Sequence, residues 1–293
     1  MRLGPFDTSK INVRSSDGGG GGGMGGARGV GCGTLVIALI GAVVFGLDPG
    51  QTIGLLEGMQ QQSTPAQTQG SGQALSAEQV CTSSSYATEA CQALTSLDAT
   101  WEATFARAGM PFQQPFLDLY RNGRVTTKGC GSATSAVGPF YCPADKGIYI
   151  DTSFYDQLAQ MAGTGGDFAR LYVLAHEYGH HIQNITGLAA QVRQAQQRNP
   201  QAANRLQVAM ELQADCYAGM WAGKNRSLIE PGDLEEGLKA ASAIGDDTLQ
   251  RNAGQAINPE GFTHGTSRQR MDALKRGLNA RDDTACNVYF EGS

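Results

Sequence analysis

Charged side chains are scarce in this 293-residue sequence and make up 17% of it; 27 acidic against 22 basic residues leave a net charge of −5. Proteins that bind nucleic acid through its phosphates normally carry an excess of basic residues. The composition therefore excludes nucleic acid as an expected partner. Hydrophobic residues, at 41%, suffice for a sizeable core, and no internal repeat is found.

The sequence also lacks Cys-x-x-Cys pairs, which excludes a zinc site built from cysteines. Of the seven cysteines, Cys32 lies in an apolar run near the N-terminus. The other six are scattered and favour three disulfides formed in an oxidising compartment. Reduced, buried thiols in a cytosolic protein are the alternative. We prefer pairing of neighbours, which gives Cys81–Cys91, Cys130–Cys142 and Cys216–Cys286.

No charged residue occurs in residues 30–47. At about 1.5 Å per residue this stretch reaches roughly 27 Å, enough for a transmembrane helix. A cleaved signal peptide or a lipoprotein site at Cys32 fits less well than an uncleaved anchor. Basic residues precede the stretch and acidic residues follow it, which predicts a single-pass membrane protein with a cytoplasmic N-terminus and the large C-terminal domain on the periplasmic or extracellular side. Residues 1–29, which end in a glycine-rich tract, are expected to be a disordered tail.

A folded domain is expected from residue 76 to residue 293, after a Gln/Ser/Thr-rich linker over 48–75. Strand patterns occur at 120–125 and 138–151, and the second predicts a β-hairpin. Asp233 and Glu236 predict a capping box at the start of one helix. Because strands come first and helices follow, the expected class is α+β, mainly helical with a small sheet. Helical patterns cover residues 76–105, 153–163, 167–185, 188–198, 201–223, 233–245 and 266–278.

The sequence His-Glu-x-x-His begins at His176. On a helix, His176 and His180 are separated by about 400° and so extend from the same face, as two ligands of a tetrahedral zinc ion must. Glu177 lies about 100° away, where it can reach a water molecule without binding the metal. Two histidines on a surface helix are the alternative, but the flanking residues are uncharged.

A catalytic zinc ion needs a third protein ligand and keeps a fourth position for water. Glu211 supplies a carboxylate, and Asp215, one turn later, can accept the remaining ring N–H of a ligating histidine. An acidic, solvated face is the alternative, but both residues occur within the apolar stretch AMELQADCYAGMW. The sequence therefore predicts one Zn²⁺ per chain, bound by His176, His180 and Glu211.

The two motifs together resemble those of gluzincin metallopeptidases. More narrowly, the stretches GPFYCPAD, IYID, LAHEYGHHIQ, ELQADCYAG, ASAIGDD and THGTSRQR, with a glycine-rich N-terminus before one apolar segment, resemble the bacterial putative neutral zinc metallopeptidase family. This resemblance covers nearly the whole chain. It implies a zincin-like, membrane-anchored zinc hydrolase, and it does not imply a known substrate.

Two further histidines remain. His181 points away from the metal face and is expected to pack or form hydrogen bonds. His264, before a helix that Thr266 or Ser267 can cap, is a candidate catalytic residue for stabilising the oxyanion of a tetrahedral intermediate, as gluzincins do with a His or Tyr. Arg268 or Arg270 is then a candidate for binding the substrate. The alternative is that His264 has a local capping role and that the arginines are exposed to solvent. Asp246 and Asp247 are interpreted as a turn.

These features predict an endopeptidase that hydrolyses peptide bonds of a protein substrate with metal-activated water and Glu177 as general base. A zinc-binding pseudopeptidase or adaptor, and a zinc amidase that cleaves a cell-wall bond, are the alternatives; a structural protein tethered to the membrane is a weaker one. The strand at 148–151 is expected to present an edge to an extended peptide. A Cys216–Cys286 bridge is expected to stiffen the helix that carries Glu211.

Overall fold

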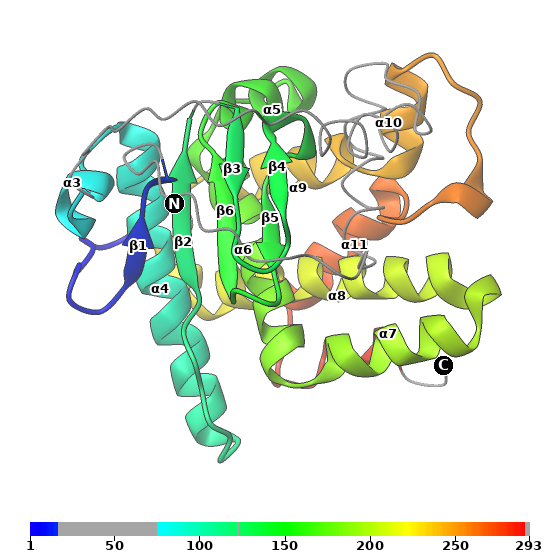
Figure 1. Cartoon of the computed structure of the whole chain (residues 1–293), viewed down its shortest axis with the longest axis horizontal. Helices are drawn as coiled ribbons and strands as arrows, with labels where there is room; N and C mark the ends of the chain where they lie inside the picture. The colour runs from blue at the N-terminus through cyan, green and yellow to red at the C-terminus, as the bar shows by residue number, and fades with distance from the viewer. Residues whose placement is uncertain (17–74, 122, 291–293) are drawn as a thin grey trace, which may run out of the picture.

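A four-stranded sheet forms one layer of the protein, shown as a computed structural model that describes residues 1–16, 75–121 and 123–290 (Figure 1). Its strand order is β1-β2-β6-β5, with the first three strands parallel and β5 antiparallel to β6. A separate antiparallel pair, β3 and β4, lies beside it. The strands are β1 (Asn12–Arg14), β2 (Phe116–Tyr120), β3 (Arg124–Thr126), β4 (Ser132–Thr134), β5 (Phe140–Cys142) and β6 (Gly147–Asp151).

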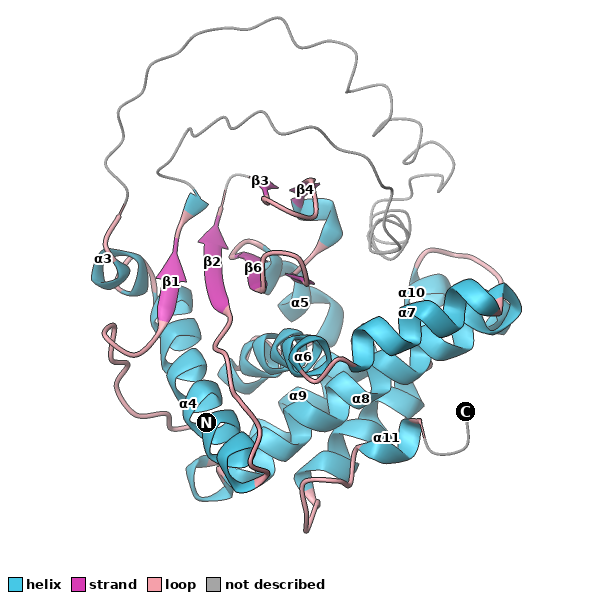
Figure 2. Cartoon of the chain, turned by 60° about the horizontal axis from the view of Figure 1, so that its bottom comes forward, coloured by secondary structure: helices cyan, strands magenta, loops and turns pink. Residues whose placement is uncertain are grey.

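Helices make up most of the rest of the described fold, so the α+β, mainly helical prediction is confirmed. Helix α6 runs behind the sheet, and α8 and α11 lie beyond it (Figures 1 and 2). The helices are α3 (Ala77–Cys81), α4 (Ser85–Arg107), α5 (Phe154–Ala162), α6 (Asp167–Ile185), α7 (Leu188–Arg198), α8 (Ala203–Lys224), α9 (Asp233–Ala243), α10 (Asp246–Asn252) and α11 (Ser267–Leu278).

The sheet separates two hydrophobic clusters because successive side chains of a strand point to opposite faces. Leu117 and Leu119 of β2 join the main core with residues of α4, α6 and α8. Tyr120 and Tyr149 belong to a smaller cluster, which is covered by Val125 of the β3–β4 hairpin. Helix α6 is therefore supported by a sheet that is itself packed on both sides.

Residues 1–16 belong to this domain, which corrects the prediction that the first 29 residues form a disordered tail. Strand β1 pairs with β2, residue Asn12 opposite Phe116. Arg14 donates from Nε to Asp118 Oδ2 at 2.7 Å, and the backbone N–H of Ser16 donates to Asp118 Oδ1 at 3.0 Å. The expectation overlooked that a short segment can be ordered by pairing with a strand far away in the sequence. Residues 17–29 lie outside the described residues.

The predicted single-pass membrane topology is wrong. A single pass between residues 14 and 116 would leave β1 and β2 on opposite sides of a membrane, whereas the two strands pair. In the ranges that the structure describes, no helix combines the length and the apolar character that a membrane span requires. The stretch 30–47 and most of the expected linker lie outside the described residues.

Several local predictions are confirmed and others are corrected. All three preferred disulfides are present, Cys81–Cys91, Cys130–Cys142 and Cys216–Cys286, whereas Cys32 lies outside the described residues. The predicted hairpin is β5–β6. The expected capping box is absent from the start of α9, because Gly232 is the N-cap and Asp233 is already helical. The expected helix over 76–105 is interrupted between α3 and α4, and α10 is additional.

Candidate metal centre

Helix α6 buries the first four residues of the His-Glu-x-x-His motif, and His180 is half-buried. Residues 171–179 are all buried, in agreement with the burial predicted from the uncharged residues that flank the motif. Gly179 allows α8 to cross α6 closely: a Cβ atom on Gly179 would lie 2.9 Å from Cα of Ala214 and 3.0 Å from its carbonyl oxygen. Ala214 follows Glu211 by three residues, so this crossing carries Glu211 to the histidine face of α6.

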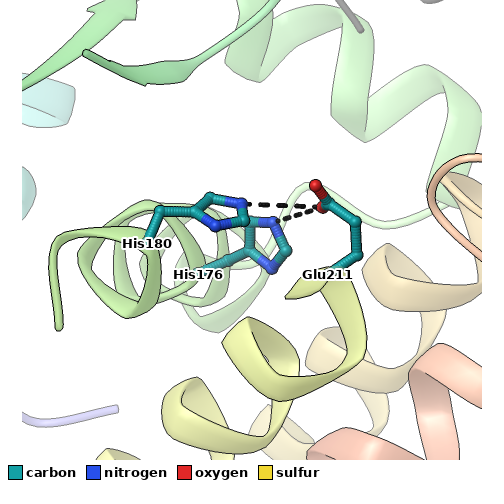
Figure 3. Close-up of side chains that lie close together, drawn as sticks. All are labelled: His176, His180 and Glu211. Carbon is teal, nitrogen blue, oxygen red and sulfur yellow. Dashed lines mark hydrogen bonds and ion pairs between the residues drawn. The ribbon is translucent and has the colours of Figure 1, made fainter. Parts of the chain in front are cut away.

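The structure brings His176, His180 and Glu211 together, and Figure 3 shows both rings directed at one carboxylate oxygen. Oε2 of Glu211 lies 3.2 Å from His176 Nε2 and 3.6 Å from His180 Nε2. Ligands that surround a tetrahedral zinc ion at about 2.0–2.1 Å are separated from one another by about 3.3 Å. Both separations are close to this value, and all three ligand atoms lie within 4.8 Å of one another.

Each of these three side chains is oriented by a second polar group. His176 Nδ1 bonds Asp215 Oδ1 at 2.8 Å. His180 Nδ1 bonds Gln183 Oε1 at 2.8 Å, and Gln207 donates to Glu211 Oε1 at 3.0 Å. When Nδ1 carries the proton, Nε2 keeps its lone pair for a metal. The donor set therefore fits zinc in chemistry as well as in spacing.

In this cluster, burial and nearby charges shift the pKa values of the side chains in opposite directions. Burial lowers the pKa of His176, but Asp215 outweighs this effect and raises it to about 9. Burial also lowers the pKa of His180, but the charge of Glu211 outweighs burial and raises it. Burial raises the pKa of Glu211, yet His180 and His176 hold it well below its usual value. Binding of a metal cation at these rings would therefore release protons.

Glu177, the expected general base, follows His176 and is only 8% exposed. Burial raises the pKa of its carboxyl group, while the charges of His176 and His180 act in the opposite direction. A carboxylate in such an environment is a stronger proton acceptor than one in water.

His264 is buried and is held by Asp246, a residue that sequence analysis assigned to a turn. His264 Nδ1 lies 3.1 Å from Asp246 Oδ1. The backbone N–H groups of Thr263, His264 and Gly265 donate to Asp246 Oδ2 at 2.8, 2.7 and 3.0 Å. The charge of His264 is also among the causes that lower the pKa of Glu211, after those of the two motif histidines.

The other predicted site residues have different roles. Arg270 is buried and bonds Asp215, so it is not available to bind substrate, and Arg268 is exposed and paired with Asp272. His181 forms hydrogen bonds as expected, from Nδ1 to Tyr141 Oη at 3.0 Å and from Nε2 to the Gln113 carbonyl oxygen at 2.6 Å. Thr266, one of the two expected residues, caps α11.

A second acidic group, Asp167, Asp233 and Glu236, also has its carboxylates close together. The ammonium group of Met1 lies 3.0 Å from Asp167 Oδ1 and 2.9 Å from Asp233 Oδ2. These carboxylates are therefore already compensated by a positive charge, and the group does not compete with the histidine cluster as a metal centre.

Comparison with known proteins agrees with this geometry. The family model described as Putative neutral zinc metallopeptidase matches residues 7–289. The chain belongs to this family. The uncharacterized protein YpfJ of Escherichia coli strain K12 is 43% identical over 297 residues, which cover 98% of this chain and 97% of that protein.

A mycobacterial relative matches over a shorter region. The uncharacterized protein Rv2575 of Mycobacterium tuberculosis strain H37Rv is 41% identical over 207 residues, which cover 66% of this chain and 67% of that protein. No solved structure matches this chain. The assignment of individual residues to roles therefore depends on the geometry of this site.

Proposed function

We propose that this member of the family is a zinc-dependent endopeptidase of the gluzincin type. One observation carries the proposal: His176, His180 and Glu211 converge with the spacing of zinc ligands, and Glu177 lies beside them on the same helix. A structural zinc site normally has four protein ligands and no need for a general base. Three ligands with an adjacent carboxylate are typical of a catalytic site.

Zinc held by these three side chains would supply the Lewis acidity that activates water and polarises the substrate carbonyl group. Glu177 takes the proton of the attacking water molecule and later transfers it to the leaving amine. His264, with Nδ1 fixed by Asp246, retains Nε2 for the substrate and, when protonated, donates from Nε2 to the developing oxyanion. No covalent bond between the chain and the substrate is needed.

Strand β5 is suited to aligning an extended peptide. It is one of the two edge strands of the four-stranded sheet. Strand β6 is paired with β2 and with β5, so the expectation of an edge at residues 148–151 is wrong. Tyr141 of β5 bonds His181 of α6, and Asn184 of α6 donates to Tyr141 Oη at 2.8 Å. This connection fixes the strand relative to the metal-binding helix, and a peptide added to β5 would lie beside it.

The test compares the full-length protein with its Glu177→Gln variant, with zinc content measured by elemental analysis and cleavage of casein by gel electrophoresis. We expect about one zinc ion per chain in both proteins and cleavage by the wild type alone. Glu235→Gln, an exposed carboxylate on α9, is the control and should cleave normally. Absence of zinc from the wild type would refute the metal centre. Zinc without cleavage of casein or of a peptide panel would refute the endopeptidase.

A further inference from the structure

Arg270 is among the largest fully buried side chains in the described part of the protein, with 2% of its surface exposed. Removing a guanidinium group from water is costly unless charge and hydrogen bonds compensate it. The residue lies on α11, and the functional roles assigned above do not require it. Its burial beside the metal centre therefore needs an explanation.

The guanidinium group forms a fork on Asp215. Nε donates to Oδ2 at 2.8 Å and Nη2 donates to Oδ1 at 2.9 Å. Nη1 donates to the carbonyl oxygen of Ile244 at 3.2 Å, and Nη2 also lies 3.3 Å from Tyr172 Oη. Arg270 thus connects α11 with α8, α6 and the end of α9, and Asp215 is the point where these contacts meet.

Asp215 Oδ1 is the atom that bonds the His176 ring. It also accepts a hydrogen bond from Tyr172 Oη at 2.5 Å. A carboxylate bound at both oxygens by one planar guanidinium group cannot rotate about its terminal bond without breaking a charge-assisted hydrogen bond. Arg270 and Tyr172 together fix the direction from which Asp215 approaches the His176 ring.

We propose that Arg270 is a positioning residue for the zinc centre, because it fixes Asp215 and Asp215 fixes the ring of His176. The inference rests on the proposed zinc site. It gives α11 a part in the metal centre although no residue of α11 is a ligand. A lysine in place of Arg270 would keep the positive charge but would lose the planar two-point contact.

The experiment measures the zinc dissociation constant by competition with a chromophoric chelator, in full-length wild type, Arg270→Lys and Tyr172→Phe. Loss of a partner that orients a metal-binding histidine typically raises the dissociation constant by about 10–100-fold, and we expect both variants to fall in this range. Arg276→Lys, the same substitution at an exposed position of α11, is the matched control. The absorption spectrum of bound Co²⁺ should change in the two variants and not in the control.

A purely structural role would lower the unfolding temperature of the metal-free protein and leave the dissociation constant unchanged. Zinc affinity of Arg270→Lys within twofold of wild type would overturn the inference. If Arg270→Lys does not fold, Tyr172→Phe decides by the same criterion. A wild type that binds zinc but cleaves no substrate would refute the peptidase and leave this comparison valid, whereas a wild type that binds no zinc would overturn both.

Discussion

Asp98 of α4 is a buried carboxyl group whose ionisation should destabilise the fold. It is 3% exposed, and its Oδ1 accepts a hydrogen bond from Tyr178 Oη on α6 at 2.6 Å. Its Oδ2 is buried without a hydrogen-bond partner among the described residues. Burial raises the pKa of Asp98 from 3.8 to about 7, against the Tyr178 hydrogen bond and with help from the charge of Glu102.

The direction of the pH effect follows from that shift. Because the pKa is higher in the folded state, the folded protein binds more protons than the unfolded chain between about pH 4 and pH 7. The stability contributed by the neutral carboxyl group is complete below the unfolded pKa and is lost as the pH rises through the folded pKa. A shift of roughly 3 units, at about 1.4 kcal/mol per unit, gives a loss of up to about 4 kcal/mol by pH 8.

Asp98→Asn keeps an oxygen acceptor for Tyr178 and removes the ionisation. We expect the variant to gain stability relative to wild type as the pH rises, by up to about 4 kcal/mol between pH 4 and pH 8. Urea unfolding of both proteins at several pH values measures this difference, in which the contributions of other titrating groups cancel. Asp272→Asn, at an exposed position, is the control. A difference between Asp98→Asn and wild type that does not change with pH would refute the reasoning.

Two further predictions concern the helix that carries Glu211. The Cys216–Cys286 bridge closes a loop of 70 residues, so replacing both cysteines with alanine should lower the free energy of unfolding by about 4 kcal/mol; unchanged urea unfolding would reject a stiffening role. Gly179→Ala should gain about 1 kcal/mol of helix propensity but lose about 1–3 kcal/mol by displacing Ala214, so its unfolding temperature should fall and its zinc affinity should weaken. An unfolding temperature and a zinc affinity equal to or higher than those of wild type would show that α8 moves aside without cost.

The features that sequence analysis predicted best depend on residues close together in the chain. His176 and His180 share a face because four residues make slightly more than one helical turn, whatever the rest of the fold does. The β5–β6 hairpin is likewise local. Asp215 lies at the His176 ring. Since Glu211 and Asp215 lie on one helix, the position of the first constrains the position of the second.

The errors arose where a distant contact decides the outcome. The local sequence of residues 1–16 favours disorder, and pairing with β2 orders part of this segment. Asp246 was interpreted as a turn residue, although it binds three backbone N–H groups and the His264 ring. Neither contact leaves a signal in the local pattern, because its energy comes from a partner elsewhere in the chain.

The sequence by itself determined the donor types, the helix that presents two of them and the position of Glu177, because helical periodicity acts over one or two turns. Tertiary structure alone decided that Glu211 meets the two histidines at 3.2 and 3.6 Å, since this depends on how closely α8 crosses α6. It also decided that Arg270 contacts Asp215 instead of solvent. A sequence records the charge of an arginine, but burial, which makes its pairing obligatory, exists only after the helices have packed.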